Sequence, residues 1–356
     1  MGMNKIEIKG YKSIQNQKIK LTSINILIGA NGSGKSNFLS FFEFLFNLYE
    51  QKLRPYVKQN GEMDSFLHKG KNPATKLSSK LFFGPNQYSF ELEKGQDHFV
   101  FTQEDLWYDN NPYYTNPFSI SNYNNESNLK FNTTPRAKYT TEFLSSFRKY
   151  HFHDTGKNSP FNSSSNIEND SYLLYSDGSN LAAILYKIKE KRTKLYVRLV
   201  KNIQNIAPYF NDFYLVPDEN NILKVRWTDK YSEYIYGVNN FSDGTIRFIA
   251  LSTLFMQPVL PKIIILDEPE LGLHPVAISN LADMIISVRE ECQVIMATQS
   301  IELLNNFEPE DILTVDNVDG ESNFTRLNSD SLSNWINDYS VGTLWKKNII
   351  NNGQPQ

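Results

Sequence analysis

The segment Ile24-Asn25-Ile26-Leu27-Ile28-Gly29-Ala30-Asn31-Gly32-Ser33-Gly34-Lys35-Ser36 decides the fold of this 356-residue chain. Its first five residues are mostly apolar and predict a buried strand. Residues 29–36 fit the pattern G-x-x-x-x-G-K-[ST], which binds phosphate groups when a strand precedes it and a helix follows. Residues 37–53 are apolar around much of their circumference, as expected for a covered helix. The order of strand, glycine-rich loop and helix therefore predicts a nucleotide-binding P-loop.

The residue types of this loop suit contacts with a nucleotide. Glycines let backbone N–H groups turn toward phosphate oxygens, and the following helix presents its positive N-terminus to them. We expect Lys35 to reach the β- and γ-phosphates and Ser36 to ligate Mg²⁺. The alternative, a glycine-rich turn that carries Lys-Ser by chance, is disfavoured by the flanking strand and helix. The nucleotide-binding candidates in this half of the chain are Lys12, Gly29, Asn31, Gly32, Ser33, Gly34, Lys35, Ser36 and Asn37.

A second apolar run, residues 263–266, ends in the two acids Asp267 and Glu268. An all-apolar run is typical of a strand buried on both faces of a parallel sheet, and such sheets bind ligands at the carboxyl ends of their strands. We therefore expect Asp267 beside Mg²⁺ and Glu268 as the general base for the attacking water, because a partly dehydrated site raises the pKa of a carboxylate. A strand followed by a charged turn is the alternative.

The rest of the chain divides by composition into an α/β arrangement. Residues 54–147 are rich in Asn, Tyr and Pro with short alternating stretches, which indicates an antiparallel β-insertion with long loops. A helical region is expected over residues 181–206, and strand–helix alternation over residues 241–318. We expect one head over residues 1–320, made of lobe I at about 1–150 and lobe II at about 151–320, and a C-terminal tail over 321–356.

Charge and apolar content limit the function without deciding it. A formal net charge of −3 gives no global attraction to nucleic acid, so DNA contact would need a local patch. The densest basic stretch, residues 187–201, fits either a solvated helix face or a DNA-contacting one. The N-terminus has no apolar h-region, and no run of about 18 apolar residues occurs. We therefore expect a cytoplasmic protein without a signal peptide or membrane span, and a core position for the single cysteine, Cys292.

Three further segments resemble motifs of ABC proteins. Residues 241–245 (FSDGT) are similar to the signature of the RecF/SMC-like group, residues 270–275 (ELGLHP) to the D-loop region, and residues 297–300 (ATQS) to the switch region. The chain thus resembles an ABC-type ATPase of the RecF/SMC-like branch. The likeness extends to a bacterial group of ATPases akin to the ATPase half of overcoming-lysogenization-defect nucleases, through residues 150–155, 177–182 and 335–345.

This resemblance implies an ABC-type P-loop head with a mixed, largely parallel core sheet flanked by helices, and ATP with Mg²⁺ as ligands. It also implies that the signature residues Ser242, Asp243 and Gly244 meet the nucleotide of a second subunit. The switch residue is Gln299 instead of the common His; its amide can donate to a γ-phosphate but cannot become charged, which favours slow turnover.

The Q-loop position, by contrast, holds no clear glutamine. His153 or Asp154 is our candidate there, against the alternative that His151 and His153 share a strand face and simply pack or meet solvent. The candidate catalytic residues are then Lys35, Glu268 and Gln299, and the candidate metal ligands are Ser36 and Asp267, with His153 or Asp154 as further candidates.

The family resemblance also implies a role in DNA repair or anti-phage defence. We expect an ATP-dependent homodimer that controls a separately encoded nuclease or Toprim-like protein, docked on residues 107–123, with DNA as a further partner. Two alternatives stay open: a scaffold that binds ATP without hydrolysis, and the nucleotide-binding subunit of a membrane transporter, against which the β-insertion and the tail argue. The acids after residue 314 are scattered, and residues 316–320 indicate a hairpin turn instead of a nuclease centre.

Overall fold

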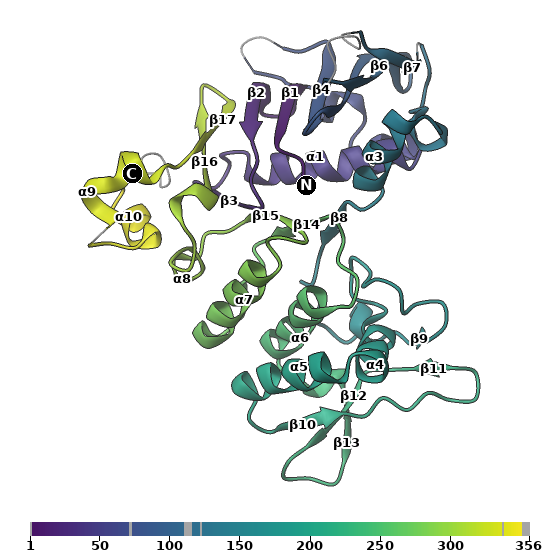
Figure 1. The fold of residues 1–356 in the computed structure, drawn as a ribbon, viewed down its shortest axis with the longest axis vertical. Coiled ribbons are helices and arrows are strands. Elements are labelled where there is room, and N and C mark those ends of the chain that lie inside the picture. Colours follow the sequence, from purple (N-terminus) through teal and green to yellow (C-terminus); the bar gives the residue numbers. More distant parts are fainter. Residues whose placement is uncertain (1, 71–72, 110–115, 122, 337, 351–356) are drawn as a thin grey trace.

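The computed structural model describes residues 2–70, 73–109, 116–121, 123–336 and 338–350. It shows an elongated molecule in which an upper and a lower lobe meet at a central sheet (Figure 1). No helix in these described ranges is both long enough and apolar enough to cross a membrane. The docking loop expected at residues 107–123 lies partly outside the described residues, at 110–115 and 122.

The central sheet has six strands in the order β17-β16-β3-β15-β14-β8, of which all but β17 are parallel to their neighbours. Successive side chains of a strand point to opposite faces, so Ile26 packs into the core of the lower lobe and Leu27 into that of the upper lobe. The strands are β3 (Ile24–Ile28), β8 (Arg148–Tyr150), β14 (Ile263–Asp267), β15 (Gln293–Ala297), β16 (Ile312–Val318) and β17 (Glu321–Arg326).

The upper lobe places α1 (Lys35–Tyr49) between the central sheet and a second, antiparallel sheet. The expected antiparallel insertion is confirmed, and it also contains α2 (Leu53–Gln59) and α3 (Pro135–Leu144). The second sheet has the order β2-β1-β4-β5-β6-β7, with β1 (Lys5–Tyr11), β2 (Ile14–Lys20), β4 (Lys76–Phe83), β5 (Asn86–Lys94), β6 (Phe99–Tyr108) and β7 (Phe118–Ser121).

The sequence of strand β2, IQNQKIK, is mostly polar. It is an edge strand that pairs with β1 alone, and only Ile14 and Ile19 of its residues are buried. An edge strand with so few apolar residues carries little periodic signal.

The lower lobe is built from α4 (Leu181–Lys191), α5 (Thr193–Ile206), α6 (Asp243–Met256) and α7 (Pro275–Ser287). The helical region expected over residues 181–206 is confirmed but is broken at Arg192, whose φ of −142° and ψ of 55° leave the helical range. Small sheets close the lobe: β10 (Phe210–Phe213), β12 (Arg226–Asp229) and β13 (Ile235–Gly237) form one, and β9 (Ser165–Asn166) and β11 (Ile222–Leu223) the other.

The basic stretch of residues 187–201 follows this helix pair. Its apolar members Ile188 and Leu199 are buried, whereas Lys191, Arg192 and Lys194 are exposed. The charged side chains thus lie on an exposed helix face, and contact of this face with DNA stays a prediction.

The C-terminal segment is packed onto the head and does not stand apart from it. The turn at Asp319-Gly320 joins β16 to β17, which confirms the expected hairpin, and β17 joins the central sheet although it lies beyond residue 320, where we expected the head to end. The short helices α8 (Ile301–Leu304), α9 (Ser333–Ile336) and α10 (Val341–Lys346) follow, and Trp345 of α10 is buried in the core of the lower lobe. Cys292 is buried as expected, and burial raises its pKa to about 12.

Candidate nucleotide-binding site

The carboxyl ends of β3, β14 and β15 converge on one small pocket of about 170 Å³. Its walls come from three segments that are far apart in the sequence: the P-loop after β3, the two acids that end β14, and the residue two positions after β15. The lining residues are Asn31, Gly32, Gly34, Lys35, Ser36, Asn37, Asp267, Glu268 and Gln299.

The P-loop curls through glycines in the left-handed region. Gly32 has a φ of 79° and Gly34 a φ of 110°, which residues with a Cβ rarely adopt. Around Gly32 the space is open, since an added Cβ would have no atom within 4 Å. At Gly34 it is closed, because an added Cβ would lie 1.9 Å from Ser322 Oγ.

Ser322 is a brace of the P-loop that the sequence did not indicate. Its Oγ lies 2.6 Å from the backbone oxygen of Ser33 and 2.7 Å from Ser13 Oγ, and Asn37 Nδ2 donates to the same Ser13 oxygen. Strand β17 and the β1–β2 turn therefore hold the loop from outside. Only the three-dimensional pairing of β17 brings Ser322 to this position, which explains why no local motif points to it.

Lys35 folds over the loop, and its Nζ donates to the carbonyl oxygens of Gly29 (2.7 Å) and Ala30 (2.9 Å). Burial lowers the pKa of Lys35, whereas the carboxylates of Glu268 and Asp267 raise it. A cation held between these carbonyls and two carboxylates is suited to an incoming phosphate, because the phosphate oxygens can replace the carbonyl contacts.

Glu268 and Gln299 contact each other across the pocket. Gln299 Nε2 donates to Glu268 Oε1 (2.8 Å) and to Asn31 Oδ1 (3.0 Å), so one amide links the acid pair to the P-loop. Glu268 has a φ of 44°, a conformation that costs a non-glycine residue about 1–3 kcal/mol. The backbone N–H of Glu268 donates to Ala297 O (2.9 Å), which ties this strained turn to β15.

Ser36 and Asp267 line the same pocket and offer a hydroxyl and a carboxylate, which are the hard oxygen ligands that Mg²⁺ prefers. The described ranges contain no group of three or more His, Cys, Asp or Glu side chains that could enclose a metal ion. Two protein ligands fit an ion that takes its remaining ligands from phosphate oxygens and water. Lys149, which the sequence did not indicate, lies beside this pair with its Nζ 3.9 Å from Asp267 Oδ2.

Two of the predicted nucleotide-binding residues, Lys12 and Ser33, do not line the pocket. Lys12 Nζ donates to Ser40 Oγ (3.0 Å) on α1 and does not line the pocket. Ser33 Oγ is buried, and among the described residues it neither donates nor accepts a hydrogen bond.

At the predicted Q-loop position, His153 Nε2 lies 3.1 Å from the backbone oxygen of Asp267, at the end of β14. Asp154 Oδ1 instead accepts from Gly156 N in a local turn. Of the two candidates, the structure brings only His153 against the acid pair. Desolvation lowers the pKa of the neighbouring His151 to about 4, with Lys149 and His153 adding to the effect.

The signature segment lies at the N-terminus of α6 and does not line the pocket. Ser242 Oγ accepts from Thr245 N (3.2 Å) and caps the helix. An added Cβ at Gly244 would lie 2.2 Å from Gly272 O, so the start of α6 packs directly against the D-loop.

Arg247, which the sequence analysis missed, strengthens this junction. Its guanidinium donates to the backbone oxygens of Phe152 (3.0 Å), His153 (3.1 Å) and Leu271. The signature helix is thereby attached to the segment after β8 and to the D-loop, which follows the acid pair at the end of β14.

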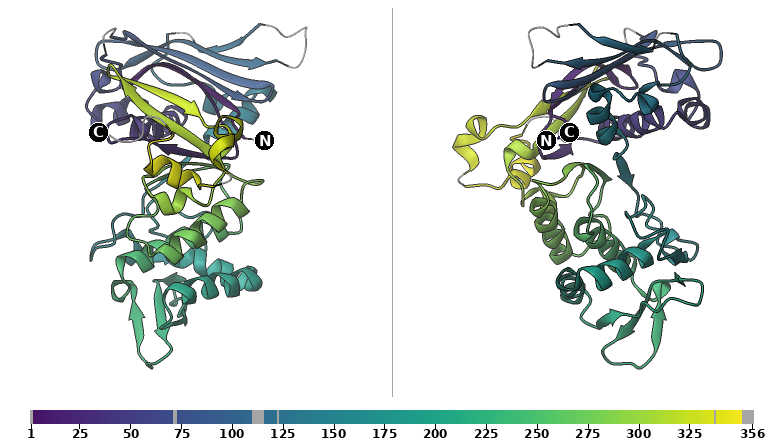
Figure 2. Two further views of the ribbon diagram at one scale, coloured as in Figure 1. Left: turned by 90° about the vertical axis from the view of Figure 1, so that its left-hand side faces the viewer. Right: turned by 45° about the vertical axis from the view of Figure 1, so that its right-hand side comes forward.

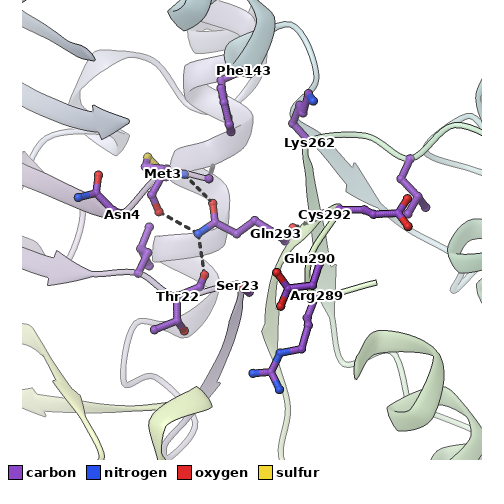
Figure 3. A pocket seen from close by; sticks show the side chains of 14 residues that line it. Met3, Asn4, Thr22, Ser23, Phe143, Lys262, Arg289, Glu290, Cys292 and Gln293 are labelled. Atoms are coloured by element: carbon purple, nitrogen blue, oxygen red, sulfur yellow. Dashed lines mark hydrogen bonds between the residues drawn. The ribbon is translucent and has the colours of Figure 1, made fainter. Parts of the chain in front are cut away.

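A wider pocket of about 700 Å³ lies at the opposite, amino-terminal ends of β3, β14 and β15 (Figure 3). Its central side chain is Gln293, which accepts from Met3 N (3.1 Å) and donates to Met3 O (2.8 Å) and Thr22 O (2.7 Å). These contacts attach the N-terminal segment to the sheet, and they engage both Oε1 and Nε2 of Gln293. This pocket is therefore a structural junction, away from the P-loop.

Comparison with known proteins agrees with the site. Residues 24–305 match the family described as "AAA domain, putative AbiEii toxin, Type IV TA system". The chain belongs to this family. The match spans every motif of the pocket, from the P-loop to Gln299. The finer likeness to overcoming-lysogenization-defect ATPases stays a prediction.

The fold of this AAA family member is that of SMC head domains and confirms the expected ABC-type α/β head. A crystal structure of an Smc head bound to the C-winged helix domain of ScpA superposes with a TM-score of 0.63 at 16% identity, covering 94% of this chain and all of the other. An Smc head with an extended coiled coil from Pyrococcus furiosus, bound to the C-terminal domain of ScpA, gives 0.56 at 16% identity, covering 95% and 99%. The two views in Figure 2 show the short α4–α5 pair in the lower lobe, with no long coiled coil among the described residues.

A curated relative matches a smaller part of the chain. It is a protein of Mycoplasma genitalium called a "putative ABC transporter ATP-binding protein", 32% identical over 63 residues. These residues make up 18% of this chain and 17% of that protein, so the chain aligns with about a sixth of the relative's length.

The brace at Gly34 generates a first prediction. Gly34→Ala should reduce nucleotide affinity at least tenfold, because the methyl group would overlap Ser322 Oγ and Gly34 has a φ reserved for glycine. The double variant Gly34→Ala with Ser322→Gly should recover part of the affinity, since the overlap with Ser322 is gone, whereas the φ strain and a 2.8 Å approach to Ser13 Oγ remain. Titration with a fluorescent ATP analogue measures both. Equal affinity of the single and double variants would show that Ser322 does not constrain the loop.

Proposed function

We propose that this chain is an ATP-hydrolysing switch that dimerises on ATP and controls a separately encoded nuclease in DNA repair or anti-phage defence. The observation that carries the hydrolytic part is the meeting of Lys35, Glu268 and Gln299 in one pocket, from segments that follow three strands of one sheet. Family membership supports ATP as the nucleotide.

Each residue of the pocket has a chemical role in this proposal. Lys35 leaves its carbonyl contacts to bind the β- and γ-phosphates, and Ser36 and Asp267 hold Mg²⁺, which neutralises charge on the phosphates. Glu268 accepts a proton from the attacking water. The Gln299 amide, which donates one N–H to Glu268 Oε1, fixes the direction of that carboxylate. Its second N–H, which donates to Asn31 Oδ1, can donate to the γ-phosphate instead.

Dimerisation is supported by the position of the signature. Ser242 caps a helix of 14 residues whose N-terminus carries partial positive charge, yet it lies outside the pocket of its own chain. An anion site of this kind is complete when a second copy brings its nucleotide to Ser242 and Gly244. A two-fold symmetric pair would satisfy both sites at once. ATP then holds the dimer together, and hydrolysis releases it.

A separate effector is supported by the resemblance to ATPases that work beside a nuclease or Toprim-like protein. The expected docking segment contributes less exposed aromatic surface than its sequence indicates, because Trp107 Nε1 donates to Ser89 Oγ and Lys80 Nζ lies 3.9 Å from its ring centre. Tyr123 remains 74% exposed and is the described aromatic residue of this segment best placed for a partner.

The hydrolytic role is tested by Glu268→Gln. This variant should bind ATP normally and hydrolyse it roughly 10²–10⁴-fold more slowly, the usual loss when a general base is removed. Phosphate release with saturating Mg²⁺-ATP gives the rate, and Lys35→Ala, which should not bind ATP, is the negative control. Wild-type turnover by Glu268→Gln would remove Glu268 from this role.

Dimerisation is tested by light scattering with and without ATP. Glu268→Gln should shift to dimer when ATP is added, and adding Ser242→Arg should prevent the shift because the arginine obstructs the signature surface. Ser287→Arg, at an exposed position near the other end of the lobe, is the matched control and should leave the shift intact. A dimer that forms without ATP and is unaffected by Ser242→Arg would show that the two subunits contact each other through another surface.

The need for a separate nuclease is tested with supercoiled plasmid, ATP and Mg²⁺ or Mn²⁺. We expect the plasmid to stay intact with this chain alone. Cleavage that persists in Lys35→Ala but disappears on joint Asp316→Ala and Asp319→Ala substitution would reveal a nuclease centre in this chain.

A further inference from the structure

Glu270 is a buried carboxyl group next to the pocket that none of the roles above uses. It is 8% exposed and lies two residues after Glu268, in the D-loop turn. Leu273 N donates to the backbone oxygen of Glu270 (3.0 Å), so the turn fixes its position. A buried carboxyl group is costly unless specific contacts compensate, so its contacts indicate what it does.

Among the described residues, Thr298 supplies the side-chain hydrogen bond to the Glu270 carboxyl. Thr298 Oγ1 donates to Glu270 Oε1 at 2.5 Å and accepts from the backbone N–H of Ser300 at 2.9 Å. The backbone N–H of Thr298 donates to Leu27 O (3.1 Å) in the P-loop strand. Thr298 is fully buried, and both hydrogen-bonding capacities of its hydroxyl are therefore used.

Gln299 lies between these two anchored residues, Thr298 and Ser300. Its side chain reaches back to Glu268 Oε1 and Asn31 Oδ1. Glu270, Thr298, Gln299 and Glu268 thus form a closed chain of contacts, in which Glu270 is the fixed end because the D-loop turn holds its backbone.

The second oxygen of Glu270 distinguishes this group from an ordinary structural contact. Oε2 is buried and has no hydrogen-bond partner among the described residues. Burying an oxygen without a hydrogen bond is unfavourable, because the water contacts that it loses are not replaced. Burial raises the pKa of Glu270, hydrogen bonds from Thr298 and from the backbone of Glu270 and Gln299 lower it, and the charge of Glu268 raises it. The fold therefore tolerates an unfavourable burial of Glu270 Oε2. Strained or unsatisfied groups of this kind often occur near functional sites.

We propose that Glu270 is a positioning residue for ATP hydrolysis, which fixes the switch segment through Thr298 and so holds the Gln299 amide between Asn31 and Glu268. This inference rests on the proposed hydrolytic function. Without the Glu270–Thr298 contact, residues 298–300 lose their anchor to the D-loop, and Gln299 no longer sets the direction of the base. Nucleotide binding, which depends on the P-loop on another segment, is retained.

The test compares two ways of breaking the same contact. Glu270→Ala removes the acceptor, and Thr298→Val removes the donor while keeping nearly the same side-chain volume, so that a folded variant is available even if Glu270→Ala unfolds. Each should lower kcat by roughly 10- to 100-fold, comparable to the loss of an outer partner that orients a metal ligand. The affinity for a fluorescent ATP analogue should change less than threefold in both.

Rescue and coupling separate positioning from general stability. Glu270→Gln keeps an acceptor oxygen and Thr298→Ser keeps the donor hydroxyl, so each variant should retain most of the turnover. The Glu270→Ala, Thr298→Val double variant should be no slower than the slower single variant, because residues of one contact are not additive. Glu302→Ala, which removes an exposed carboxylate from α8 just after the switch segment, is the matched control.

Three outcomes would overturn the inference. Wild-type kcat in both Glu270→Ala and Thr298→Val would contradict it while leaving the proposed hydrolysis standing. A parallel loss of ATP affinity and kcat would indicate a structural role alone. Absence of ATP hydrolysis by the wild-type protein would overturn the proposed function together with this inference.

Discussion

The close approach of the C-terminal hairpin to the P-loop is the constraint on which the site depends. An added Cβ at Gly29 would lie 2.2 Å from Val315 O on β16, and one at Gly34 would lie 1.9 Å from Ser322 Oγ on β17. The loop can turn its N–H groups toward a phosphate only because these two positions lack side chains. Since β16 pairs with β3 in parallel, the hairpin cannot move away without breaking the central sheet. The curl of the P-loop is therefore a property of the whole sheet.

The same sheet explains why three distant segments meet. Parallel strands end at a common edge, so Gly29, Asp267 and Gln299, which follow or end β3, β14 and β15, must lie together once the strands pair. This part of the site could be predicted from the sequence, because short, mostly apolar runs and the loops after them are local signals. The family match over residues 24–305 covers the same segments.

The parts that the sequence could not predict are long-range and polar. Ser322 reaches Ser33 across 289 positions, and Arg247 reaches Phe152 across 95, through backbone oxygens that any residue could supply. Glu270 gave no signal of its own within the D-loop pattern, and its role depends on the hydroxyl of Thr298, 28 residues away. The break at Arg192 was missed for a different reason: residues 181–206 are helical by pattern on both sides of it, and one non-helical residue does not interrupt the periodicity.

The signature at the start of α6 lies outside the pocket, so it can influence the acid pair only through the residues between them. Arg247 supplies a physical connection: one planar guanidinium binds the backbone of residues 152 and 153 and of Leu271. His153 in turn contacts the backbone oxygen of Asp267. A displacement of α6 would therefore pull on both the D-loop and the end of β14, because hydrogen bonds to backbone atoms move the chain itself. Glu268, which is held in a strained φ of 44° between these two segments, is the residue whose geometry such a displacement would change most.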